Sequence, residues 1–98
     1  MKINKTTDGS KLTIALEGRL DSSTSPELEN ELKESMSGVQ ELHFDFSELE
    51  YISSAGLRVL LAAQKEMSKQ GTMAISGVND TVMEVFEVTG FVDILTIE

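Results

Sequence analysis

Two hydrophobic periodicities alternate along this chain of 98 residues, and their order limits the folds that it can adopt. Every second residue is apolar in strands with one buried face, whereas apolar residues three or four apart are typical of amphipathic helices. Helix patterns separate most of the strand patterns, so we expect strands and helices to alternate through one small domain over residues 1–98. The strand patterns lie at 11–17, 41–46, 72–76 and 92–97, and the helical stripes at 28–36, 57–67 and 82–86.

The first strand pattern belongs to an expected hairpin. Asp8-Gly9 just before residues 11–17 is a turn signal, and Ile3 with its neighbours then forms an antiparallel partner strand. The later strands are joined through helices by short connections, which favours parallel pairing and right-handed crossovers. The expected fold class is α/β, an α+β arrangement with a mixed sheet of four or five strands in the order β-β-α-β-α-β-α-β.

Polar residues and glycines mark the ends of the expected helices. Ser25 suits a helix N-cap and Pro26 the first helical position, where its missing N–H costs nothing. Asn79 or Asp80 is expected to cap the third helix. Glycine favours helix ends, and one follows each helical stripe, at Gly38, Gly71 and Gly90.

The strands alternate instead of being continuously apolar. A sheet covered by helices on both faces has more uniformly apolar strands. We therefore expect the helices to cover mainly one face. The other, more polar face is expected to carry Thr13, Glu17, His43 and Asp45.

Composition excludes several classes of function. A net charge of −9 repels nucleic-acid phosphates and attracts basic partners, although acidity also serves solubility alone. The absence of cysteine excludes disulfides, thiol catalysis and thiolate metal sites. No apolar run approaches the ~20 residues of a membrane span, and residues 1–10 lack the apolar stretch of a signal peptide. We expect a cytoplasmic monomer with no metal, cofactor, membrane or nucleic-acid partner.

The segment from 45 to 58 is the candidate functional region, because sites gather beyond the carboxyl ends of parallel strands. Ser53 and Ser54 lie there beside the free N–H groups at the start of a helix. A phosphoserine adds a charge of about −1.5 to −2, which those N–H groups and the helix dipole favour. Alternatively, either serine is a plain N-cap and Gly56 only permits close packing.

The remaining candidates favour structure over chemistry. His43 has no second histidine near it in sequence and is interpreted as structural. Asp45 is interpreted as a strand-end turn residue, since no nucleophile pairs with it. Arg58, one turn after Ser54, is expected to pair with an acid at 48 or 50 or to reach a phosphate. A Walker-type run is absent, and the chain is interpreted as a protein without enzymatic activity.

Three runs, in the same order along the chain, resemble motifs of the STAS domain family as found in anti-sigma factor antagonists. The central run is F-S-E-L-E-Y-I-S-S-A-G-L-R-V-L-L, at 46–61. The run L-E-G-R-L-D-S at 16–22 is similar to the Gly-x-Leu-Asp motif of the family, and F-E-V-T-G-F at 86–91 to a third motif. Together with the element order, these runs span nearly the whole chain.

The resemblance implies a phosphorylation switch. In the family, the unmodified STAS protein sequesters an anti-sigma factor that is itself a serine kinase with an ATP-binding fold. Phosphorylation of an acceptor serine breaks the complex, and a metal-dependent serine phosphatase resets it. By position the acceptor is Ser54, two residues before Gly56, with Ser53 as second choice. The implied partner surface comprises Asp21, Ser22, Ser53, Ser54, Ala55, Gly56 and Arg58.

This chain departs from the family pattern at one position. Many members carry Asp immediately before the acceptor, where this chain has Ser53. That difference keeps an alternative open: a stand-alone STAS module that binds a nucleotide or lipid or scaffolds a larger signalling complex.

Overall fold

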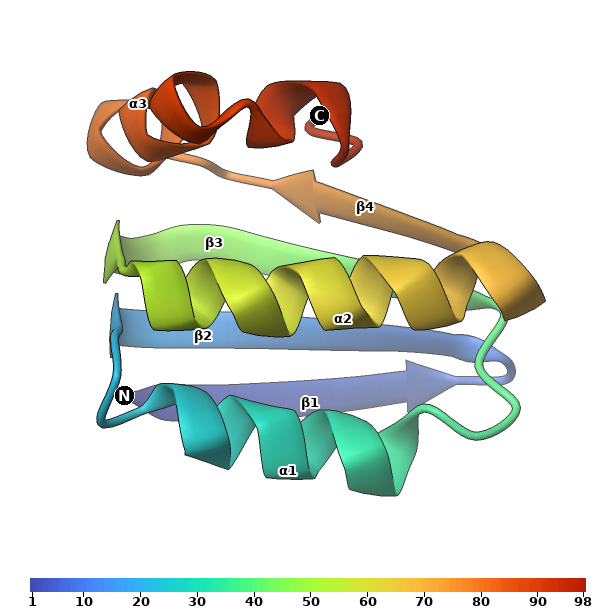
Figure 1. Ribbon diagram of the computed structural model, residues 1–98. Helices are drawn as coiled ribbons and strands as arrows, with labels where there is room; N and C mark the ends of the chain where they lie inside the picture. The colour runs from blue at the N-terminus through green and yellow to red at the C-terminus, as the bar shows by residue number, and fades with distance from the viewer.

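Four strands form one mixed sheet in the order β1-β2-β3-β4 in the computed structural model, which describes residues 1–98 (Figure 1). The β1–β2 pair is antiparallel and turns at Gly9, whose φ of 60° is left-handed, as the Asp-Gly signal predicted. The β2–β3 and β3–β4 pairs are parallel. The strands span Lys2–Asp8 (β1), Lys11–Leu20 (β2), Glu41–Ile52 (β3) and Thr72–Ser76 (β4).

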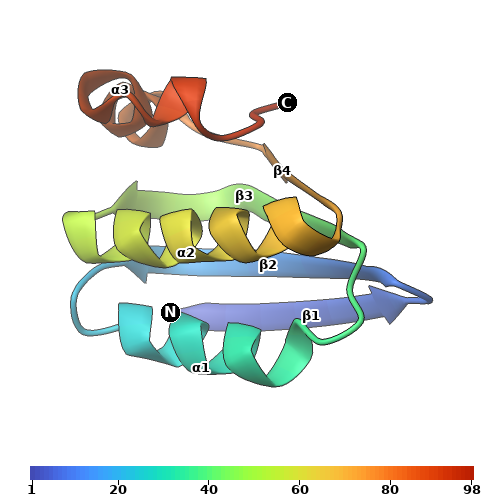
Figure 2. The same ribbon diagram turned by 45° about the vertical axis from the view of Figure 1, so that its right-hand side comes forward.

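The helices cover one face and one edge of this sheet. Helices α1 (Ser25–Ser35) and α2 (Ser54–Gln70) pack side by side on one face (Figures 1 and 2). Helix α3 (Asp80–Thr89) and the short 3-10 turn η1 (Phe91–Asp93) lie at the β4 edge, away from α1 in both views. The observed arrangement confirms the predicted mixed α/β class with helices mainly on one face.

The core lies between the sheet and the helices. Alternate strand residues, including Leu12, Ile14 and Phe44, are buried against buried residues such as Leu28 and Leu60 of the helices. The strand residues between them point to the opposite face and are only half-buried. That face carries the polar residues predicted for it, Thr13, Glu17, His43 and Asp45.

The strand pattern at 41–46 predicted too short a strand, because β3 continues to Ile52. Two register shifts against β2 each insert one extra residue into β3: Ala15 pairs with Asp45 but Glu17 with Glu48, and Gly18 pairs with Leu49 but Arg19 with Tyr51. Each β-bulge changes the spacing of buried residues from two to three. The inward side chains therefore fall at Phe46, Leu49 and Ile52.

Asp45 lies at the first bulge. Its carboxylate accepts a hydrogen bond from the Ser47 N–H at 3.0 Å, which is the turn-like contact predicted for it. The predicted position at a strand end was wrong, because β3 continues past it. This hydrogen bond and a further one from the Ser47 side chain, followed by the nearby His43, hold the pKa of Asp45 below its ordinary value.

The helix ends follow most of the predicted signals. The Asn79 side chain caps α3 by accepting from the Val82 N–H at 2.8 Å, and Gly90 ends that helix with a left-handed φ of 79°. Helix α2 ends at Gly71, as predicted, whereas α1 ends at Ser35, before Gly38.

Ser25 does not cap α1, contrary to prediction. Thr24 occupies the N-cap position, and Ser25 is the first helical residue. The Ser25 hydroxyl instead donates to the Asp21 carbonyl at 2.6 Å, so it fastens the helix to the preceding turn. Pro26 lies in the first helical turn, where its missing N–H is tolerated.

The expected terminal strand at 92–97 is reduced to one isolated bridge between Ile97 and Ile75. Gly90 turns the chain into η1, which uses the first part of that segment. The Ile75 N–H donates to the Thr96 carbonyl at 2.9 Å, and the Glu98 N–H donates to the Ile75 carbonyl at 2.8 Å. Only the last residues therefore reach the outer edge of β4.

Gly56 allows α2 to pack closely against the ends of β2 and β3. A Cβ atom there would lie 2.8 Å from both Ile52 Cγ1 and Leu20 Cγ. We predict that Gly56→Ala lowers the free energy of unfolding by about 1–3 kcal/mol through overpacking, as measured by urea denaturation. Ala62→Ser, at an exposed position of the same helix, is the control and is expected to change stability by less than about 0.5 kcal/mol. Equal stability of the two variants would contradict this packing role.

Asn79 connects α3 to the bulged part of β3. Its Nδ2 donates to the Leu49 carbonyl at 2.9 Å, while its Oδ1 caps the helix. We predict that Asn79→Ala destabilises the protein by about 0.5–2 kcal/mol in thermal unfolding. Asn79→Ser keeps a capping oxygen and loses only the bond to Leu49, so it should recover part of the loss; no difference between alanine and serine would rule out the cap.

Candidate functional site

The candidate site lies where β2 and β3 end side by side. Leu20 pairs with Ile52, the last residues of the two parallel strands, and the Ser53 N–H donates to the Leu20 carbonyl at 2.9 Å. The chain leaves β2 through the turn 21–24 into α1, and leaves β3 through Ser53 into α2 (Figure 1). The predicted residues at 21–22 and at 53–58 are therefore brought to the same edge, although some thirty residues separate them in sequence.

Asp21 organises the turn between β2 and α1. Its Oδ1 accepts hydrogen bonds from the Ser23 hydroxyl at 2.7 Å, from the Ser23 N–H at 3.0 Å, and from the N–H and hydroxyl of Thr24 at 3.2 Å each. The Thr24 hydroxyl also lies 2.8 Å from the Arg19 carbonyl, to which it can donate instead. The hydrogen bond from the Ser23 hydroxyl, followed by the others, lowers the pKa of Asp21 below its ordinary value, so this edge carries a fixed negative charge.

The two adjacent serines have different surroundings. Ser53 occupies the N-cap position of α2, but its hydroxyl makes no capping bond; the oxygen is buried and has no hydrogen-bond partner. Ser54 is the first residue of α2 and is exposed. The alternative of a capping serine is thus correct for Ser53 in position only, and Ser54 alone offers an accessible hydroxyl.

A shallow groove of about 360 Å³ runs between the first turns of α1 and α2. Three of the predicted partner-binding residues line it, namely Ser22, Ala55 and Arg58. Arg58 is exposed and takes part in none of the four ion pairs of the structure, so the predicted pairing with Glu48 or Glu50 was wrong. Since Arg58 projects from α2 into the groove while those acids lie on β3, its guanidinium is left free to meet an anion.

One contact at this edge has no signal in the sequence pattern. The guanidinium of Arg19 lies over the ring of Tyr51, 4.4 Å from its centroid, a cation–π contact between neighbouring strand ends. The two residues are partners only because of the second bulge in β3. Predicting the contact therefore requires the register of β2 against β3, and a regular alternation of side chains without bulges gives the wrong register.

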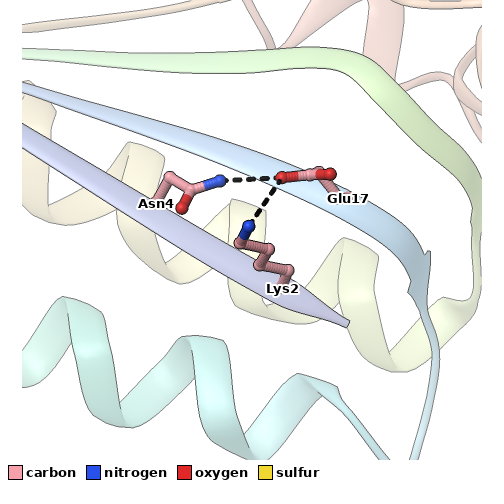
Figure 3. Close-up of polar contacts among 3 residues, drawn as sticks. All are labelled: Lys2, Asn4 and Glu17. Carbon is pink, nitrogen blue, oxygen red and sulfur yellow. Dashed lines mark hydrogen bonds and ion pairs between the residues drawn. The ribbon is translucent and has the colours of Figure 1, made fainter.

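Polar side chains on the face of the sheet that α1 and α2 leave uncovered form contacts with one another. Asn4 Nδ2 donates to Glu17 Oε2 at 2.9 Å, and Lys2 Nζ lies 3.9 Å from the same oxygen (Figure 3). His43 Nε2 is 2.7 Å from Ser76 Oγ. Thus His43 has a structural partner, in keeping with its predicted role, and it lies on a different part of the sheet from Ser54.

The structure contains no group of three or more His, Cys, Asp or Glu side chains arranged to hold a metal ion. None of its helices has both the length and the apolar character that a membrane span requires.

Comparison with known proteins identifies the family. The family model described as Mlab, STAS domain matches residues 3–96. The chain is 34% identical to BtrV of Bordetella bronchiseptica, whose name describes it as an anti-sigma factor antagonist. The match covers 99% of this chain and 85% of that protein. It is 30% identical to the anti-sigma-B factor antagonist of Listeria monocytogenes, over 96% of this chain and 84% of that protein.

Solved structures share the fold. The crystal structure of a Thermotoga maritima protein assigned to the same class superposes with a TM-score of 0.90 at 18% identity, covering 97% of this chain and 84% of that one. The phosphorylated form of the Bacillus cell fate determinant SpoIIAA gives a TM-score of 0.77 at 17% identity, covering 99% of this chain and 91% of that one. On the extent of the family match and the identity to BtrV, the chain belongs to the STAS domain family.

Proposed function

We propose that this chain is an anti-sigma factor antagonist whose unphosphorylated form binds a kinase-fold anti-sigma factor and whose phosphorylation at Ser54 ends that binding. The observation that carries the proposal is the contrast between the exposed Ser54 and the buried Ser53 hydroxyl at the start of α2. The names of its sequence relatives support the same class of function. SpoIIAA, which shares the fold, has been solved in unphosphorylated and phosphorylated forms.

The chemistry proposed at Ser54 is a phosphoryl transfer catalysed by the partner. The Ser54 hydroxyl oxygen attacks the γ-phosphorus of the ATP held by the kinase, the bond to ADP breaks, and the hydroxyl proton leaves to a base of the kinase. A metal-dependent serine phosphatase restores the hydroxyl with water and releases inorganic phosphate. The antagonist supplies only the acceptor, and it would act as a monomer in the cytoplasm, where ATP is available.

Local electrostatics explain how a phosphate at Ser54 would act without refolding the chain. The backbone N–H groups and positive dipole end of α2 favour the added charge of about −1.5 to −2. Arg58, one turn along α2 and free of any ion pair, is positioned to neutralise part of it. The charge of Asp21 at the same edge adds to the negative field, so a partner complementary to the unmodified surface would be repelled.

We predict that Ser54→Asp weakens binding to the cognate anti-sigma kinase at least about tenfold, a loss of about 1.4 kcal/mol, in isothermal titration. Ser53→Asp is not a neutral control, because its hydroxyl is buried. Ser54→Ala is the matched control: it should bind like the parent chain and accept no phosphate in a kinase assay read by mass spectrometry. Phosphate on Ser53, or full binding by Ser54→Asp, would overturn the assignment.

The lowered pKa of Asp21 gives a prediction about pH. Its charged form is favoured by folding, so its contribution to stability is fully present above the ordinary value of 3.8 and is lost as pH falls through the lower folded-state pKa. Asp21→Ala should therefore lower the Tm at pH 7, and the difference from the parent chain should shrink on acidification toward pH 3. Ser22→Ala, an exposed neighbour in the same turn, is the control; a Tm difference independent of pH would refute the charge-based account.

A further inference from the structure

Three large apolar side chains are exposed within one short stretch of the chain. The exposed fractions are 81% for Val88, 48% for Ile94 and 38% for Val92, whereas the other large apolar residues are buried or half-buried. Together they span the last turn of α3, η1 and the residue that follows. Scattered exposed apolar residues are ordinary, but a concentration of them in one short segment favours an interaction surface.

The backbone that carries these side chains is fixed. Val82 and Phe86 hold α3 in the core, and Leu95 is buried just after the stretch. Two backbone hydrogen bonds close η1: the Asp93 N–H donates to the Gly90 carbonyl at 3.2 Å, and the Ile94 N–H donates to the Phe91 carbonyl at 3.0 Å. The apolar groups are therefore presented by an ordered corner and not by a frayed end.

The charged residues in the C-terminal part of the chain, which carries the exposed apolar groups, are all acidic. All eight Lys and Arg residues lie before residue 70, whereas the charged residues within 70–98 are all Asp or Glu. Those next to the apolar groups, Glu84, Glu87 and Asp93, take part in none of the ion pairs of the structure. The exposed apolar residues of this segment are thus accompanied by three acids that form no ion pair.

We propose that Val88, Val92 and Ile94 form a second docking surface, here called the α3 corner, for a protein segment that carries an apolar stripe flanked by Lys or Arg. Charge complementarity selects this occupant. A second copy of the chain in a two-fold symmetric dimer would bring the same acidic residues against this corner, and anionic lipid is likewise repelled. The corner lies at the β4 edge, opposite α1 (Figure 1), so it is distinct from the groove beside Ser54.

The α3 corner gives the protein a place to hold a second partner independently of the switch at Ser54. Because no residue of the corner belongs to the proposed kinase-binding edge, a phosphate on Ser54 leaves it free. The proposal does not rest on the function proposed above, since it follows from exposure and charge at 84–94 alone.

A synthetic peptide tests the surface directly. The probe is a helical peptide of about 18 residues, five turns, with Leu along one face and Lys on both flanks; its twin carries Glu in place of Lys. Titration into the ¹⁵N-labelled protein should shift the amide signals of 84–94, and the binding should weaken as salt rises. Equal binding of the Glu twin, or shifts spread evenly over the chain, would overturn the proposal.

Variants then locate the binding. The double variant Val88→Ser/Ile94→Ser should weaken the Lys peptide about tenfold, equivalent to about 1.4 kcal/mol, while the unchanged spectrum of the core shows that it is folded. The control is Ala62→Glu, at an exposed position of α2 in a second groove between α1 and α2, away from Arg58, and it should leave binding unchanged. Loss of binding in the control alone, or sedimentation showing that the α3 corner is already covered by a second copy, would refute the assignment.

Discussion

The parallel pairing of β2 with β3 at their carboxyl ends is the constraint on which the rest of the structure depends. It brings two chain reversals to one edge, so that the Asp21 turn and the start of α2 become neighbours. Gly56 then lets α2 pack directly on the last residues of both strands. The exposed Ser54 thus follows directly on strand ends against which α2 is closely packed.

The polar groups at this edge differ greatly in the number of hydrogen bonds that they make. Asp21 concentrates several hydrogen bonds on one oxygen, whereas the Ser53 hydroxyl is buried without any. A buried hydroxyl without a partner costs free energy, about 1–3 kcal/mol in typical proteins. Its presence beside the exposed Ser54 indicates that local geometry here is set by packing between α2 and the strand ends, and not by capping.

Much of the fold was predictable from sequence because most elements obey regular periods. The hairpin at Gly9, the two-residue alternation of β2 and β4, and the cap at Asn79 all depend on neighbours within a few residues. The second half of β3 was missed because its bulges convert the spacing of two into a spacing of three. The terminal segment was misread because Gly90 redirects the chain before pairing begins.

The general location of the candidate site was also predictable from the sequence. Its residues follow strand ends, and parallel topology brings such ends together. The surroundings of Arg58 could not be predicted from the sequence. Whether Arg58 pairs with Glu48 or Glu50 depends on which side of α2 faces the groove. The difference in exposure between Ser53 and Ser54 was likewise not predictable, because it depends on the burial of individual atoms at adjacent positions of identical chemistry.

The two bulges in β3 determine which changes of length the strand tolerates. Each adds one residue while the side chains beyond it keep their faces, because the spacing of inward residues widens from two to three. Deleting Glu50, the extra residue of the second bulge, would return that spacing to two and leave Leu49 and Ile52 inward. Deleting a residue from the regular part, such as His43, would instead turn the later side chains of β3 to the opposite face. The bulges also bend the strand and increase its twist, so losing one would change the direction in which the chain enters α2.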